Sequence, residues 1–289
     1  MINRIKNNFK ILKKCFLGYC ATIFPLLEVV TIFIPLEDFG INSRRAKILL
    51  FIVLLCIGIG IAFSVISILL RRNKQVFGDT SNGCTICYGN LMKIAFDNKE
   101  KKEKIIVIHV NRCFDLSCEN NLIRENSIHG QFLKKYIHDE NERNELHNYI
   151  ENDLTNRNIE FETLSKKDKK SGYLKRYPAG TVVEVKGENN VVFYLLALSK
   201  LDNNLIANCT ELEFYNSLSK LLVYYDSYGQ GADLYCAVMG DKIVKPHRET
   251  KETIDFMISV FKFNNNEIRG NINLVIYEGL KSTISILDY

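Results

Sequence analysis

The run Ile105–Asn111, with the segment that follows it to Gly130, constrains the fold more than any other part of the chain. The run is apolar and β-branched and has no helical period, which predicts a strand buried on both faces of a parallel sheet. A polar loop at 112–126 follows, and after Ser127 the apolar residues recur on one face of a helix. Open α/β sheets bind ligands at the carboxyl ends of such strands, so we expect a ligand site at this corner.

Strands and helices alternate through the rest of the chain. Further strands are predicted at 84–88, 181–186, 191–197, 232–239 and 272–277, and further helices at 142–154, 212–225 and 251–263. This alternation predicts an α/β fold with three layers, α/β/α, and a ligand site along the carboxyl ends of the strands.

Two apolar stretches precede this domain. Residues 15–36 contain a single charge, and residues 48–70 contain none, so each is long enough to cross about 30 Å of hydrocarbon. Lys and Arg are more numerous in the two outer flanks than in the loop between the stretches, which predicts that both ends lie in the cytosol. We therefore expect a transmembrane helical hairpin at 1–74 and a cytosolic domain at 75–289.

Three residues of the hairpin invite a functional interpretation. A carboxylate inside a membrane costs a few kcal/mol unless it is protonated, paired or hydrated. Glu28 therefore indicates either a polar path or oligomer contact, or a position near the membrane surface. Gly60 and Ser64 have the small-residue spacing that permits close helix contact, so they are candidates for self-association.

The sequence carries no strong catalytic or metal-binding motif: P-loop, GxSxG, HExxH and GxGxxG patterns are all missing from it. Cys84 and Cys87 could begin a zinc site, but they fit a buried strand better, and we expect no metal. A nucleophilic pair of Cys113 with His129 is conceivable, and two small loop residues are the simpler interpretation. The net charge of +5 is modest and concentrated near the N-terminus, so no nucleic-acid partner is expected.

Several short stretches together resemble a known family. They are Val110-Asn111, Phe114-Asp115, residues 127–132, residues 177–181 and residues 194–199. This pattern resembles a divergent branch of the macro domain, the ADP-ribose-binding α/β/α module. The branch is found behind two transmembrane helices in type II Thoeris anti-phage defence effectors, and the resemblance covers nearly the whole chain.

The resemblance implies a specific function. In such systems a TIR-domain partner senses infection and makes a nucleotide signal from NAD, which for this type is histidine joined to ADP-ribose. The macro domain binds the signal, the effector forms a homo-oligomer in the bacterial inner membrane among its lipids, and the cell is disabled. The chain would be a multi-pass membrane receptor and effector, with no enzymatic activity and no cofactor beyond this ligand.

The resemblance also assigns roles to residues. Asn90 stands where macro domains hold adenine with an Asp, and Tyr277 could stack on the same base. Asn111 matches the residue near the distal ribose, and residues 127–130 match the first loop facing the diphosphate. The loop at 112–126 lies where a group beyond the distal ribose would be bound. The full set of implied ligand contacts is Asn90, Asn111, Phe114, Asp115, Ser127, His129, Gly130, Gly180, Gly240, Asp241 and Tyr277.

Two other functions remain open at this point. The chain could be a membrane-tethered ADP-ribosyl hydrolase that uses Asn111 and an activated water. It could also be an accessory of a channel gated by another nucleotide.

Overall fold

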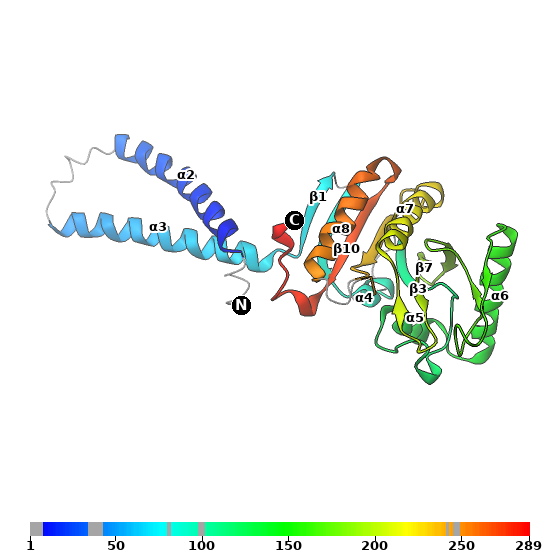
Figure 1. Ribbon diagram of the computed structural model, residues 1–289. Helices are drawn as coiled ribbons and strands as arrows, with labels where there is room; N and C mark the ends of the chain where they lie inside the picture. Colours follow the sequence, from blue (N-terminus) through cyan, green and yellow to red (C-terminus); the bar gives the residue numbers. More distant parts are fainter. Residues whose placement is uncertain (1–7, 34–42, 80–81, 98–101, 241–242, 245–248) are drawn as a thin grey trace. The chain divides into compact units, whose positions relative to one another are not determined.

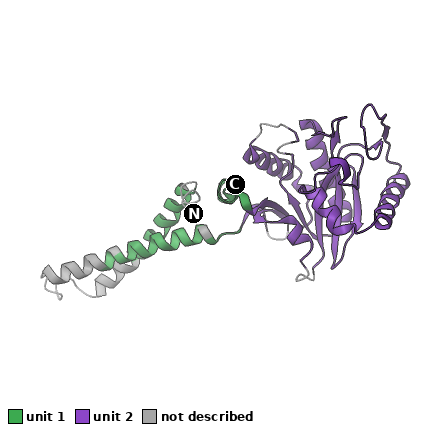
Figure 2. Cartoon of the chain, turned by 90° about the horizontal axis from the view of Figure 1, so that it is seen from below, with its two compact units in different colours: residues 1–72, 279–289 green, residues 73–278 purple. Residues whose placement is uncertain are grey.

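The computed structural model describes residues 8–33, 43–79, 82–97, 102–240, 243–244 and 249–289. The chain divides into two compact units, which are distinguished by colour in Figure 2. One comprises residues 1–72 and 279–289, and the other residues 73–278.

The N-terminal unit contains two long helices, α2 (Phe9–Phe33) and α3 (Ser43–Leu70). Their bounds overlap the spans expected at 15–36 and 48–70, and the first span also includes residues outside the described ranges. In the part of the chain that the structure describes, no helix has the length and apolarity needed to cross a membrane.

Gly60 makes a close contact with α2 of the same chain, and its predicted role in self-association stays a prediction. A Cβ placed on Gly60 of α3 would lie 2.4 Å from the ring of Tyr19 in α2, so only glycine permits this approach. Ser64 is fully buried and donates its hydroxyl to the Gly60 carbonyl at 2.8 Å. Glu28 lies within α2, and its side chain is outside what the structure describes.

The larger unit is built on one eight-stranded sheet in the order β1-β2-β10-β9-β3-β7-β6, with β8 paired to β7. The strands are β1 Asn73–Gly78, β2 Gly83–Gly89, β3 Lys104–Asn111, β6 Val182–Lys186, β7 Val191–Leu201, β8 Ala207–Asn208, β9 Asp233–Ala237 and β10 Asn271–Tyr277. Strands β2, β10, β9, β3 and β7 are parallel, while β1 and β6 are antiparallel to their neighbours. The sheet is therefore mixed, with a parallel centre (Figure 1).

The remaining elements connect or cover these strands. They are α4 Leu91–Ala95, α5 Ile128–Tyr136, α6 Glu140–Asn156, α7 Glu211–Tyr228 and α8 Thr250–Phe263, the two-residue strands β4 Glu162–Thr163 and β5 Lys175–Arg176, and the 3-10 turns η1 Glu119–Asn121, η2 Asn265–Glu267, η3 Glu278–Leu280 and η4 Ile286–Asp288. Strand β1 and helix α4 were not among the elements predicted from the sequence.

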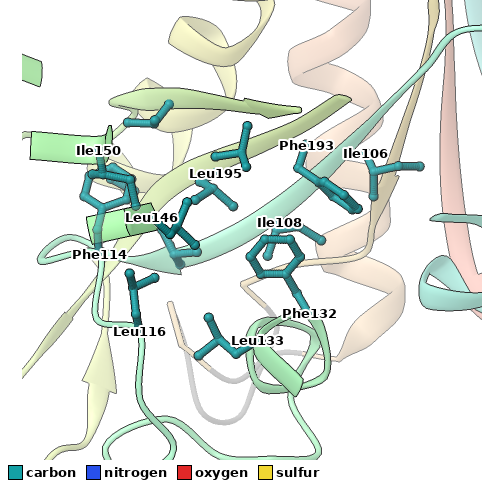
Figure 3. Packing of buried hydrophobic residues seen from close by; sticks show 14 of the residues in the cluster. Ile106, Ile108, Phe114, Leu116, Phe132, Leu133, Leu146, Ile150, Phe193 and Leu195 are labelled. Atoms are coloured by element: carbon teal, nitrogen blue, oxygen red, sulfur yellow. The ribbon is translucent and has the colours of Figure 1, made fainter. Parts of the chain in front are cut away.

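The two faces of β3 pack against different helices. Ile106 and Ile108 belong to one hydrophobic cluster with Phe132 of α5 and Ile150 of α6 (Figure 3). Ile105 alternates with them, is also buried, and lies outside that cluster, as expected when successive side chains point to opposite faces. Helices α7 and α8 pack on each other, and α7 contacts β7. The expected α/β fold is therefore present, with helices packed against a mixed sheet.

Candidate functional site

The carboxyl ends of the parallel strands form one edge of the sheet. Among the parallel strands, the chain passes from β3 to its neighbour β7, by way of the antiparallel edge strand β6, and from β9 to β10 on the other side. The direction of winding therefore reverses between β3 and β9, and open α/β sheets bind ligands at such a reversal. The structure brings the end of β3 at Asn111, the end of β9 at Ala237 and the end of β10 at Tyr277 to this edge.

Asn111 is the last residue of β3 and lies at this edge. It is 3% exposed, and its Oδ1 accepts hydrogen bonds from the backbone N–H groups of Cys113 at 3.0 Å and Asp115 at 3.4 Å. Within the described residues, its Nδ2 has no hydrogen-bond partner. A buried amide donor without an acceptor is costly, which makes this atom a candidate ligand contact.

Asp115 is fully buried and forms an ion pair with Lys169. Lys169 Nζ lies 2.6 Å from Asp115 Oδ2, both side chains are 0% exposed, and the Tyr173 N–H donates to Oδ1 at 2.7 Å. Burial raises the pKa of Asp115, and the charge of Lys169 opposes that rise. A Cβ on Gly172 would lie 2.2 Å from Oδ1, so only glycine fits here.

At the start of α5, polar groups of the protein form hydrogen bonds with one another. Ser127 caps the helix, because its Oγ accepts the Gly130 N–H at 3.0 Å and donates to the Arg124 carbonyl at 2.6 Å. A Cβ on Gly130 would lie 2.2 Å from that same carbonyl oxygen. Ser127 and Gly130 therefore fix the start of the helix against the preceding loop.

His129, in the same corner, is 5% exposed. Burial is the main cause that lowers the pKa of His129 to about 3, and the neighbouring His109 adds to this decrease. The Asp115 backbone has the opposite, smaller effect on the pKa. In the described part of the chain, His129 Nε2 has no hydrogen-bond partner. The ring is therefore neutral at pH 7 and presents a buried nitrogen.

The cysteines near the site are protonated at neutral pH. Burial raises the pKa of the Cys113 thiol, which makes it a poor nucleophile. Cys84 and Cys87 lie within β2, and burial raises their pKa values to about 12 and about 11. Their positions in a strand fit the interpretation as small hydrophobic residues.

At the other end of the edge, Asn90 and Tyr277 come together. Gly89 pairs with Tyr277 in the register of β2 and β10, and Asn90 directly follows Gly89. The Asn90 side chain caps α4 by accepting the Lys93 N–H at 3.1 Å. Tyr277 is 62% exposed, so its ring is accessible for stacking.

Three further predicted contacts have structural roles. Phe114 is 2% exposed and packs edge-on against Tyr177, so its side chain belongs to the core. Gly180 and Gly240 adopt φ values of 83° and 89°, which L side chains rarely adopt. Asp241 lies outside the described residues.

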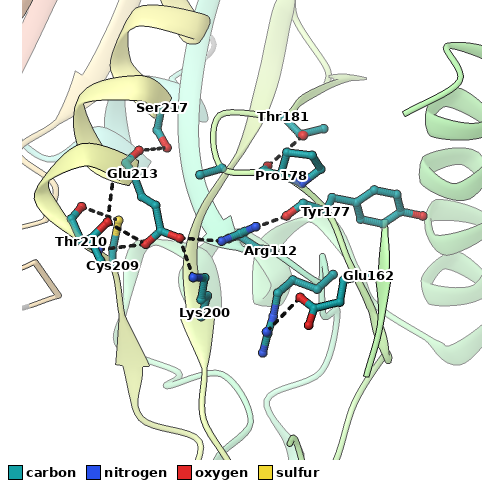
Figure 4. A network of polar contacts seen from close by, with 12 residues as sticks. Arg112, Glu162, Tyr177, Pro178, Thr181, Lys200, Cys209, Thr210, Glu213 and Ser217 are labelled. Carbon is teal, nitrogen blue, oxygen red and sulfur yellow. Dashed lines mark hydrogen bonds and ion pairs between the residues drawn. The ribbon is translucent and has the colours of Figure 1, made fainter. Parts of the chain in front are cut away.

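A polar network beside the edge escaped the sequence analysis (Figure 4). Arg112 donates to Glu213 at 2.9 Å and to the Tyr177 carbonyl at 2.7 Å, and Lys200 lies 2.6 Å from the same carboxylate. Partial burial opposes ionisation of Glu213, but hydrogen bonds from Lys200 and Thr210 outweigh it and lower its pKa to about 2. Glu213 also forms a capping box with Thr210 at the start of α7, so one carboxylate both caps the helix and binds the two cations.

A cavity of about 920 Å³ lies away from this edge. Its lining includes Phe96, Tyr136, Leu146 and residues 185–189 of the hairpin between β6 and β7. The β3 and β7 strands begin there, since Lys104 pairs with Val191. The cavity is therefore separate from the strand ends that carry the predicted contacts.

The sequence profile described as "Thoeris protein ThsA, Macro domain" matches residues 84–277, which is more than half of the chain. The chain belongs to this Thoeris macro-domain family. The match begins in β2 and ends with β10, so it spans the parallel centre of the sheet and the edge described above.

Solved macrodomains from Oceanobacillus iheyensis also align with this Thoeris macro domain. One structure contains ADP and another, of a mutant, contains ADPR; each is 12% identical and has a TM-score of 0.47. Each alignment covers 75% of this chain and 95% of the other. No curated protein matches the chain.

Proposed function

We propose that this Thoeris macro-domain protein binds a signal derived from ADP-ribose along the carboxyl ends of β2, β10, β9 and β3. The observation that carries the proposal is Nδ2 of Asn111, which is buried and has no hydrogen-bond partner in the described part of the chain, at the reversal point of a family member's sheet. The exposed ring of Tyr277 would stack on adenine, and Asn90 would contact the base beside it. The ligand would then extend from β2 across the sheet to β3.

Isothermal titration calorimetry of the full chain tests this proposal. ADP-ribose should bind, and Asn111→Ala should weaken binding at least tenfold, because the amide hydrogen bond and its orientation are lost. Asn204→Ala, in the turn after β7, is a matched control outside the site. Absence of heat with ADP-ribose, histidine-ADP-ribose and NAD would reject the proposal.

The natural signal in this proposal is histidine joined to ADP-ribose. The added group would lie beyond the distal ribose, against the loop at 112–126, and the buried pair of Asp115 and Lys169 holds that loop in one conformation. A preformed loop reduces the ordering entropy of binding. Tighter binding of the histidine conjugate than of ADP-ribose in the same titration supports this choice, and equal affinities would reject it.

The protein would act as a receptor and effector and not as an enzyme. Ligand binding would favour a self-associated state, which requires tighter binding to that state than to the monomer. The N-terminal unit would place the assembly at the bacterial inner membrane.

Gel filtration with and without the ligand tests the assembly, and fractionation of cells into membrane and soluble material tests the location. Turnover of ADP-ribosylated protein would instead support the hydrolase alternative.

A further inference from the structure

Three charged side chains gather where β3 and β7 end, beside the predicted ligand edge (Figure 4). In the register of these two strands, Asn111 pairs with Ser199. Arg112 and Lys200 are the residues that directly follow this pair. Their side chains both reach Oε1 of Glu213, at 2.9 Å and 2.6 Å. Two cations therefore converge on one carboxylate.

The carboxylate of Glu213 has no capacity for further donors. Its Oε1 accepts from the two cations, and its Oε2 accepts from the backbone N–H and the hydroxyl of Thr210, at 2.9 Å and 3.0 Å. A carboxylate has about four lone-pair sites, and these four donors occupy them. The cluster of Arg112, Lys200 and Glu213 therefore has an excess of one positive charge that no further oxygen of Glu213 can balance.

The two cations, by contrast, keep unused N–H groups. Arginine has five N–H donors and lysine has three. Within the described residues, Arg112 donates from Nε to the Tyr177 carbonyl at 2.7 Å and from Nη1 to Glu213, and its Nη2 has no hydrogen-bond partner. Lys200 has one partner there, which is Glu213. The side chains of Arg112 and Lys200 are 13% and 34% exposed, so a ligand can reach the remaining donors.

The order of the strands places this cluster beyond one end of the proposed ligand. The sheet runs β10-β9-β3-β7 along this edge. The proposed ligand extends from Tyr277 at the end of β10 to Asn111 at the end of β3. Since neighbouring strands are about 5 Å apart, a group attached to the far end of the ligand would lie next to the end of β7.

We propose that Arg112 Nη2 and Lys200 Nζ bind a carboxylate on the group that the signal carries beyond its distal ribose. The inference rests on the proposed function, because it specifies how one part of an ADP-ribose-derived signal is recognised. A carboxylate has only acceptors and carries a negative charge, so it complements unused N–H groups of a guanidinium and an ammonium. Glu213 holds the two cations side by side before the ligand arrives, which reduces the ordering entropy of binding.

The same cluster contributes little to binding of ADP-ribose alone. The far end of that molecule is a sugar, whose hydroxyls are neutral and gain less from two cations than a carboxylate does. The cluster would therefore distinguish a signal that carries an amino acid from its ADP-ribose core.

Two conjugates separate the carboxylate from the rest of the ligand. Histidine-ADP-ribose has the carboxylate, whereas histamine joined to ADP-ribose keeps the imidazole and the amine and lacks it. In calorimetry of the full chain, the wild type should bind the histidine conjugate at least about threefold more tightly than the histamine conjugate. This preference should decrease as salt is added, because the cluster is partly exposed.

Substitutions of the two cations test their roles. Lys200→Met should remove most of the preference for the histidine conjugate, and Lys200→Arg, which keeps a cation, should retain it. Arg112→Lys keeps a charge beside Glu213 but removes Nη2, so it should lower the preference severalfold. Lys186→Met, at an exposed lysine in the hairpin at the other end of β6 and β7, is the matched control and should keep the preference.

The ratio of the two affinities also identifies failure. Equal wild-type affinities for the two conjugates would overturn the inference alone, since the ADP-ribose core would still bind. An equal loss of both conjugates in Lys200→Met would overturn it as well, because the lysine would then support the shape of the site and not bind the carboxylate. A wild type that binds neither conjugate and does not bind ADP-ribose overturns both the proposed function and the inference.

Discussion

The buried, neutral His129 makes stability depend on pH in a way that can be calculated. Its pKa in the folded protein is about 3, whereas a histidine in an unfolded chain has a pKa of about 6.5. The unfolded state therefore binds more protons below pH 6.5, and the contribution of His129 to stability is present above that pH and lost as pH falls toward 3. Between pH 7.5 and pH 5.0 the calculated loss is about 2 kcal/mol.

Urea unfolding of the full chain, followed by circular dichroism, measures this loss. The free energy of unfolding is obtained at pH 7.5 and pH 5.0 for the wild type and for His129→Gln, which has no ionisable group at this position. The wild type should lose about 2 kcal/mol more than the variant over this interval, because other titrating groups contribute equally to both. Equal losses for wild type and His129→Gln would refute the assignment of a neutral, buried ring.

Three further predictions concern stability. Lys169→Met leaves Asp115 buried without a partner and should reduce the free energy of unfolding by roughly 3–5 kcal/mol, against less than about 0.5 kcal/mol for Lys170→Met, in chemical denaturation. Gly180→Ala forces a side chain into φ 83° and places its Cβ 2.8 Å from a lysine carbon, so it should cost at least about 1–2 kcal/mol, read as a lower thermal midpoint. Glu213→Gln removes a carboxylate with a pKa of about 2, whose stabilisation is present above pH 4.5 and lost as pH falls toward 2. The deficit of Glu213→Gln relative to wild type should therefore shrink in an acid titration.

The local pattern of apolar and polar residues was sufficient to predict those strands and helices whose buried side chains follow a regular spacing in the sequence. The expected strand at 105–111 corresponds to β3 (Lys104–Asn111), because a β-branched apolar run has no other favourable place than the centre of a sheet. The helix predicted at 212–225 corresponds to α7 (Glu211–Tyr228), which begins with a capping box formed by Thr210 and Glu213. In α7 the capping residues are three positions apart in the sequence, and in β3 nearly every residue is buried, so both elements can be recognised from a short stretch of sequence.

Contacts between distant segments could not be predicted in this way. Lys169 lies in a run of lysines that is typical of a solvated loop, and yet it is 0% exposed. Its partner Asp115 lies in a different loop, and no spacing rule links the two. Strand β1 was missed for a related reason, since Asn73–Gly78 is polar and becomes a strand only by pairing with β2. Tertiary context overrides weak local preference in such segments.

The candidate site shows why residue type alone assigns a ligand group poorly. A serine, a histidine and a glycine before a helix suggest an anion site, since free N–H groups at a helix start favour negative charge. In the structure, the Ser127 hydroxyl accepts the Gly130 N–H and donates to the Arg124 carbonyl, so this hydroxyl is used within the protein. Nδ2 of Asn111, by contrast, is buried and has no hydrogen-bond partner among the described residues. The hydrogen-bond partners of each atom, and not the residue names, therefore determine which groups a ligand could bind.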